Sequence, residues 1–183
     1  ENILDFSAFK TLFSLNFNIF IRTMCLTFSL AVFTLFGTRF GTEVLAANAV
    51  LMNLQNLTAS GLDGFAQAAE VLVGKEIGRK SKARLRTAVI VSSKWAFYTA
   101  VALTCFYFIF GDMIIHMLTN IEAIRETSSG YLIWIIILPL ISIWGFQLDG
   151  IFIGATAGAP MRNGMIISTI CYALSIYLLL PLW

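Results

Sequence analysis

Residues 131–156 read YLIWIIILPLISIWGFQLDGIFIGAT, and this stretch decides the class of fold. A helix needs about 20 mostly apolar residues to cross a hydrocarbon layer of about 30 Å, and this stretch is long enough. Its one charged residue is Asp149, inside the triplet Leu148-Asp149-Gly150. Because a spanning segment must satisfy its own backbone hydrogen bonds, the stretch predicts a transmembrane helix that carries an acid within the membrane.

The rest of the chain follows the same pattern. The composition is 58% hydrophobic and only 12% charged, with a mean hydropathy of +0.84, which excludes an ordinary soluble domain. Barrel strands would be shorter and would alternate apolar with polar residues. We therefore predict an all-α membrane protein, a polytopic helical bundle with about five transmembrane helices. Their expected ranges are 17–36, 46–73, 88–110, 131–154 and 165–183.

The segments outside these spans suggest how the chain is organised. Residues 1–15 carry apolar side chains at helical spacing, which predicts an interfacial linker, and residues 112–130 predict a short interfacial helix and turn. The chain begins at Glu1 without a methionine and ends directly after an apolar run. We therefore expect a piece of a longer protein, with residues 16–183 forming part of one lobe.

The distribution of lysine and arginine predicts the orientation in the membrane. These residues crowd the segment 75–86 and recur at Arg162, whereas the alternate loops are poor in them. The positive-inside rule places the basic loops in the cytoplasm, with the N-terminus cytoplasmic and the C-terminus of this chain outside. The basic segment is thus interpreted as a topology signal and not as a nucleic-acid surface. The three cysteines are isolated and His116 has no partner pattern, so no metal or disulfide site is predicted.

The second expected span carries the most informative pattern, a series of polar residues at steps of three or four. Such spacing places them on one helical face. A polar face is costly against lipid, so it should face the bundle interior or a wet cavity. One interpretation is a polar seam that holds helices together, and the other is a cavity lining. The residues are Asn53, Asn56, Ser60, Asp63, Gln67 and Glu70.

Two acids are expected near the middle of the membrane. Asp63 lies 12 residues before Lys75 and Asp149 lies 13 before Arg162, about 18 to 20 Å at 1.5 Å per residue. Each is followed by glycine, which allows close backbone approach or a local bend. A carboxylate in a low dielectric prefers its neutral form unless water or a cation stabilises its charge. Either acid could therefore carry a proton or bind a cation.

Two cations also lie within expected spans. Arg22 lies five residues after Phe17 and Glu70 lies five before Lys75, which predicts an Arg22–Glu70 pair about 7 Å inside the cytoplasmic end. The alternative for Arg22 is that its long side chain snorkels to the interface, as is expected for Lys94.

A further pattern is one of small residues. Gly150, Gly154 and Gly158 recur every four residues and predict close helix packing.

Four stretches of the chain resemble the DNA-damage-inducible F (DinF) subfamily of the multidrug and toxic compound extrusion (MATE) transporters. They are LAANAVLMNL (45–54), LDGFAQAAEVLVGKEIG (62–78), the opening stretch 131–156, and MRNGM (161–165). The resemblance implies twelve helices in two six-helix lobes that rock to expose a central cavity alternately to each side. The five spans would be the seventh to the eleventh helices. The N-terminal lobe, which in this family holds a key coupling acid, and the twelfth helix would lie outside this chain.

The resemblance also assigns a role to Asp149, which matches an acid of the tenth helix that the sodium-coupled branch uses in a cation site. This sequence departs from that branch at two positions. Gly145 stands where a tyrosine would help to coordinate the cation, and Arg22 stands where the seventh helix would supply an acid. An arginine repels a cation and could hold Glu70 or Asp149 ionised. Proton coupling is therefore favoured over sodium coupling.

The expected function is a secondary multidrug antiporter that exports lipophilic or cationic compounds in exchange for protons, with sodium as the alternative coupling ion. Expected partners are drug-like molecules, the bilayer of the bacterial inner membrane and the N-terminal lobe, with no cofactor beyond the coupling ion and no nucleic acid. Met52, Phe65, Trp144 and Phe146 are candidates for a drug-binding surface or for core packing. The expected ion-coupling or cavity residues are Asp149, Asp63, Glu70, Arg22, Asn53, Asn56 and Gln67.

Three alternatives remain open. A flippase for a lipid-linked precursor would share the two-lobe design but would need a strongly cationic cavity. A membrane-embedded enzyme would need a nucleophile, metal ligands or a histidine and an acid at one depth, and none is evident, so no enzymatic activity is expected. A structural membrane subunit would tolerate replacement of Asp63 and Asp149.

Overall fold

The computed structural model describes residues 6–179, and in this range the chain is a bundle of long α-helices. The helices are α1 (Phe6–Gly37), α2 (Thr42–Gly78), α3 (Lys82–Leu118), α4 (Glu122–Gly154) and α5 (Gly158–Leu179), with a short 3-10 helix, η1 (Thr38–Phe40), after α1. This confirms the predicted all-α bundle. By length and composition, three described segments could cross a membrane: Phe9–Phe40, Lys82–Leu118 and Glu122–Gly154.

Helices α2 and α5 do not meet the same criterion, so their membrane crossing stays a prediction. Helix α2 is long, with 37 residues, but its polar side chains lower its mean hydropathy. Helix α5 has 22 described residues and includes Arg162 and Asn163. The last residues of its expected span, 180–183, lie outside the described part.

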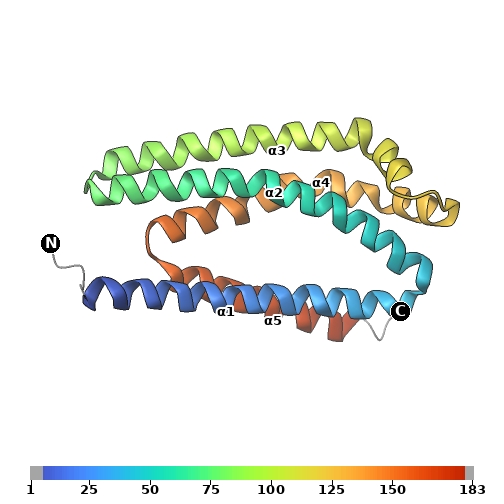
Figure 1. The fold of residues 1–183 in the computed structure, drawn as a ribbon, viewed down its shortest axis with the longest axis horizontal. Coiled ribbons are helices and arrows are strands. Elements are labelled where there is room, and N and C mark those ends of the chain that lie inside the picture. The colour runs from blue at the N-terminus through green and yellow to red at the C-terminus, as the bar shows by residue number, and fades with distance from the viewer. Residues whose placement is uncertain (1–5, 180–183) are drawn as a thin grey trace.

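Two segments expected at the membrane interface are parts of long helices, and their interfacial position stays a prediction. Residues 6–15, expected as an interfacial linker, continue directly into the rest of α1 without a break. Residues 112–130, expected as a separate interfacial helix, form the end of α3, a three-residue link and the start of α4. The end of α3 bends away from the axis of the helix (Figure 1). Helical hydrogen bonding continues through residues 6–15, which contain no proline, whereas the second segment is interrupted at residues 119–121.

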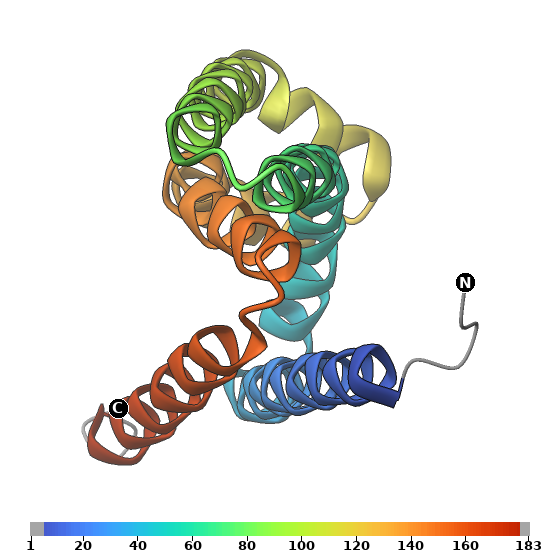
Figure 2. The ribbon, with the colours of Figure 1, turned by 90° about the vertical axis from the view of Figure 1, so that its left-hand side faces the viewer.

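The five helices form two groups. Helices α2, α3 and α4 pack against one another, and α1 and α5 lie side by side as a separate pair (Figures 1 and 2). The α2–α4 contact is the most extensive, whereas α1 touches α2 and α4 touches α5 only slightly. Seen from the end, α3 lies on the side of the three-helix group that is opposite to the α1–α5 pair (Figure 2).

The turns that follow α2 and α4 are short and alike. Each contains a residue in the left-handed region two positions after the end of the helix, Lys80 (φ 55°) and Thr156 (φ 54°). In each case a backbone N–H of the following residue bonds back across the last turn, from Ser81 to Glu76 (3.3 Å) and from Ala157 to Phe152 (2.8 Å). This hydrogen-bond pattern satisfies carbonyls that a helix end leaves free. The sharp stop directs α5 away from the three-helix group.

The core lies between α2, α3 and α4. One cluster contains Leu51, Leu54, Tyr107, Ile115 and Ile135, and a second contains Leu62, Ala96, Ala100 and Ile143. Buried alanines let the helix backbones approach closely, which is how helices associate when lipid removes the usual hydrophobic driving force. The Tyr107 hydroxyl is fully buried and donates to the Leu54 carbonyl at 3.0 Å, while Thr58 donates to the Tyr107 oxygen at 2.9 Å.

Candidate functional site

The polar face of α2 points away from the core of the three-helix group. Helix α2 buries Leu54, Thr58, Leu62 and Ala66, whereas the predicted polar residues, up to Gln67, are exposed and Glu70 is half-buried. The sequence correctly placed these residues on one face. They form no buried seam between the described helices, so the seam interpretation finds no support within this part of the chain, and the cavity interpretation stays a prediction. An exposed polar face that lies within a membrane must meet water or another part of a protein, because lipid cannot solvate it.

An ion pair joins α1 to α4 at the edge of this face. The Arg22 guanidinium Nη2 contacts the Asp149 carboxylate Oδ2, and each side chain is only about a quarter exposed (24% and 23%). A charge-assisted bond of this kind is about twice as strong as a neutral one. It links the α1–α5 pair to the three-helix group, which otherwise contact each other little.

The predicted partner of Arg22 was Glu70, and that prediction is wrong. The Glu70 side chain has no ion pair or hydrogen bond with the part of the chain that the structure describes. The error comes from how depth was counted. Helix α1 begins at Phe6, so Arg22 lies 16 residues, about 24 Å, from the start of its helix. Asp149 lies only five residues from Gly154, where α4 ends.

Asp63 completes a cluster around the same cation. The Asp63 carboxylate is near enough to Arg22 to interact with it electrostatically, and it accepts a hydrogen bond from Gln67 Nε2 at 3.0 Å. Acids from two Leu-Asp-Gly triplets, one on α2 and one on α4, thus converge on one arginine from α1. When all three groups are ionised their net charge is −1. One added positive charge would bring this sum to zero.

Two glycines of α4 bring these acids together. A Cβ at Gly150 would overlap the backbone of Ala66, and one at Gly154 would overlap the backbone of Glu70. Gly158 packs instead against α1, where an added Cβ would lie 2.9 Å from Asn18 Cβ. The predicted close packing of this glycine series is confirmed. Gly64, in contrast, has open space around it, so the second triplet does not need its glycine for packing.

The sequence analysis missed a buried polar pair beside the site. Gln147, two residues before Asp149, is 2% exposed and donates from Nε2 to Ser92 Oγ at 2.7 Å. The Gln147 Oε1 atom is buried without a partner in the described part of the chain. The signal was a glutamine and a serine within two apolar spans, but nothing in their spacing along the chain indicated that they meet.

The candidate drug-contact residues divide into two groups. Met52 lines a cavity of about 440 Å³ beside the exposed side chains of Trp134 and Tyr131. Phe65 and Phe146 pack against the Leu62–Ile143 cluster, which supports core packing for both. Trp144 is half-exposed and lies against Phe97 on α3. Among residues 6–179, no three histidine, cysteine, aspartate or glutamate side chains gather as a metal site.

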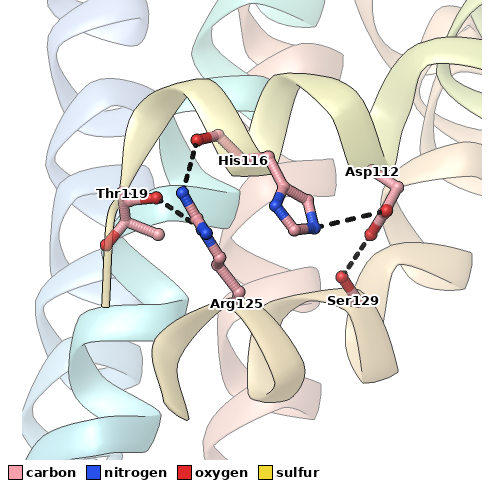
Figure 3. Close-up of polar contacts among 5 residues, drawn as sticks. All are labelled: Asp112, His116, Thr119, Arg125 and Ser129. Carbon is pink, nitrogen blue, oxygen red and sulfur yellow. Dashed lines mark hydrogen bonds and ion pairs between the residues drawn. The ribbon is translucent and has the colours of Figure 1, made fainter. Parts of the chain in front are cut away.

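A separate polar network holds the turn between α3 and α4 (Figure 3). Arg125, in the first turn of α4, donates from Nε to the Thr119 carbonyl at 2.8 Å and from Nη2 to the His116 carbonyl at 3.1 Å. Asp112 accepts from Ser129 Oγ at 2.5 Å and lies 3.5 Å from His116 Nε2. His116 thus has a neighbour that the sequence pattern did not show, one turn away on its own helix. Arg125 satisfies carbonyls that the end of α3 leaves free.

Replacing Arg125 by alanine is expected to lower the free energy of unfolding by about 1 kcal/mol, the usual size of a cationic cap at a helix C-terminus. Thermal unfolding in detergent, followed by circular dichroism, measures the change. Arg162→Ala is the matched control, because within residues 6–179 the side chain of this arginine bonds only to its sequence neighbour Asn163. Equal loss in the two variants would contradict the capping role.

Comparison with known proteins agrees with this architecture. The MatE family profile matches residues 19–180 of the chain. The DNA damage-inducible protein F of Escherichia coli (strain K12) is 36% identical over 168 residues, which are 92% of this chain and 37% of that relative. The chain therefore spans little more than a third of the length of this relative. No solved structure matches the chain. Because the family profile covers most of the chain, this multi-pass membrane protein belongs to the MATE family.

Proposed function

We propose that this chain forms a large part of the C-terminal lobe of a secondary antiporter that exports lipophilic, often cationic compounds from the cytoplasm across the bacterial inner membrane. The observation that carries the proposal is the cluster of Arg22, Asp149 and Asp63 at the exposed polar face of α2. The polar face would line a water-filled cavity against an N-terminal lobe. The basic segment between α2 and α3 would lie in the cytoplasm.

Proton coupling is the favoured mode. The cluster has one cation and two carboxylates, so one proton changes its net charge from −1 to zero. The neutral cluster is cheaper to expose to a low-dielectric environment than the charged one. Loading of a proton would therefore favour a closed cavity, and its release would favour a wet one. Sodium could neutralise the cluster in the same way, but the adjacent guanidinium would compete for the carboxylate oxygens.

The flippase alternative fits the site less well. A lipid-linked precursor carries a pyrophosphate, which needs several cations in the cavity. The exposed polar face of α2 instead carries Asp63, with Glu70 half-buried at its end, and Arg22 is already paired with Asp149. A purely structural role would not explain why two acids lie close to one arginine within an expected membrane span.

The test is ethidium efflux from cells that express the transporter containing this chain. Asp149→Asn and Asp63→Asn are each expected to lower efflux at equal expression, because each removes an ionisable group from the cluster. Glu43→Gln is the matched control, since Glu43 is exposed in the first turn of α2 and belongs to no cluster. Efflux should fall when the proton gradient is collapsed and persist when the sodium gradient is collapsed. Unchanged efflux in both aspartate variants would remove the proposed mechanism.

A further inference from the structure

A groove between α3 and α4 lies outside the charged cluster. Its volume is about 460 Å³, and its lining combines apolar and aromatic side chains with one lysine and one serine. Three large side chains on or beside it are mostly exposed: Trp95 (63%), Tyr98 (61%) and Trp144 (52%). The lining residues are Val89, Ile90, Ser93, Lys94, Phe97, Tyr98 and Trp144.

Lys94 is the unusual member of this lining. It lies 12 residues, about 18 Å, from the start of α3 at Lys82, in a helix that is apolar enough to cross a membrane. Its side chain is exposed and has no acidic partner among residues 6–179. An ammonium group within a membrane is costly unless it is paired or reaches the interface. Snorkelling would carry the ammonium group toward the lipid phosphates of the interface, so a phosphate is an anion that it can reach.

The aromatic wall beside Lys94 is already formed. Phe97 lies against Trp144 with ring centroids 6.3 Å apart, and Tyr98 meets Trp95 edge to face at 6.2 Å. The first contact joins α3 to α4, the second lies within α3, and together they form an apolar surface next to the ammonium group. Ser93 lines the same groove and supplies a hydroxyl donor. A cation with a hydroxyl beside an extended apolar wall is complementary to a phosphate that carries acyl chains.

We propose that this groove binds an anionic phospholipid, with the phosphate at Lys94 and Ser93 and an acyl chain along Phe97, Tyr98 and Trp144. The groove is nearer to the end of α3 that follows the basic segment 75–86, where anionic lipids gather if that end is cytoplasmic. A cationic drug would be repelled by Lys94, so the groove differs from the acidic cluster in the ligand it selects. The binding does not depend on which ion drives transport.

The first experiment tests whether the positive charge of Lys94 contributes to lipid binding. It is native mass spectrometry of the purified transporter that contains this chain, with phosphatidylglycerol added to the micelles. Lys94→Gln is expected to weaken phosphatidylglycerol binding about fivefold, the effect of one lysine near anionic lipid, and to leave phosphatidylcholine binding unchanged. Lys94→Arg should bind as the wild type does. Lys82→Gln, at the first residue of α3, is the control for unspecific attraction. Equal binding by Lys94→Gln and wild type, or an equal loss with Lys82→Gln, would overturn the proposal.

A second measurement tests whether a phospholipid acyl chain occupies the groove. Phosphatidylglycerol brominated on its acyl chains should quench the fluorescence of Trp144, obtained as the difference between wild type and Trp144→Phe. Quenching of that difference signal is expected because the acyl chain lies against the indole. Its absence, with other tryptophans still quenched, would mean that a further helix of the protein covers the groove, and the lipid assignment would be wrong.

Discussion

Arg22→Gln is expected to abolish most efflux by the transporter that contains this chain. The substitution keeps a polar side chain but removes the positive charge that pairs with Asp149 and attracts Asp63. Two carboxylates then share one site without a cation, and like charges at short range disfavour their joint ionisation. Loss of one partner of a buried pair costs about 3–5 kcal/mol, and the partial exposure of both side chains reduces this figure. If only about 1.4 kcal/mol of this cost falls on the transport step, the rate of efflux drops tenfold.

Ethidium efflux and thermal stability should be measured on the same preparations, because Arg22 also holds α1 to α4. The double variant Arg22→Gln/Asp149→Asn should recover part of the stability, since the Asp149 carboxylate is no longer left without its cation, but it should not recover efflux. Arg39→Gln is the control, because this arginine lies over the ring of Phe36 at the end of α1, away from the cluster. If Arg22→Gln retained wild-type efflux, the cluster could not be the coupling site.

Gly150→Ala is expected to prevent correct folding, although it adds only one methyl group. A Cβ at this position would lie 2.7 Å from the Ala66 carbonyl carbon and 2.9 Å from its Cα, distances that real Cβ atoms essentially never show. The obstacle is backbone and not a side-chain end that could rotate away. Helices α2 and α4 would have to separate along their most extensive contact. Overpacking of a well-packed core costs about 1–3 kcal/mol or more, and here it would also displace Asp149 from Arg22.

Size-exclusion chromatography of a fluorescent fusion measures this effect. Gly150→Ala should give an aggregated or greatly reduced peak. Gly145→Ala is the matched control in the same helix, because its added Cβ meets nothing within 4 Å. That variant should equal or slightly exceed the wild type in stability, since alanine favours helix over glycine by about 1 kcal/mol. Equal sharp peaks from both variants would contradict the close α2–α4 contact.

The two predictions concern the same region because packing and charge are coupled there. Gly150 and Gly154 allow α4 to lie against the backbone of α2, and this contact brings the Asp149 and Asp63 acids to one side of the bundle. Arg22 then binds from α1. Any movement of the α1–α5 pair relative to α2, α3 and α4 would stretch the Arg22–Asp149 pair, since few other contacts join the two groups. The cluster is therefore placed where ion binding could be linked to helix movement.

The sequence by itself determined the class of fold and the faces of single helices. Continuous apolar runs required helices, because only a helix satisfies its backbone hydrogen bonds alone. The spacing of polar residues along α2 was sufficient to place Asp63 and Gln67 on one face, where they form a hydrogen bond. The glycine series on α4 likewise indicated a close contact. These properties depend on residues three or four apart, which the helix itself brings together.

Only the tertiary structure decided which residues of different helices meet. Counting residues gives a depth at 1.5 Å per residue only while the chain stays helical, and the count for Asp149 ran through the turn at 155–157, after α4 has ended. Depth also gives only the position of a residue along the membrane normal. It does not indicate which helices are neighbours or which of their faces are in contact. Arg22 therefore met Asp149 and not Glu70, and Gln147 met Ser92. These pairings follow from the close α2–α4 packing and from the separate α1–α5 pair, which no local pattern of residues specifies.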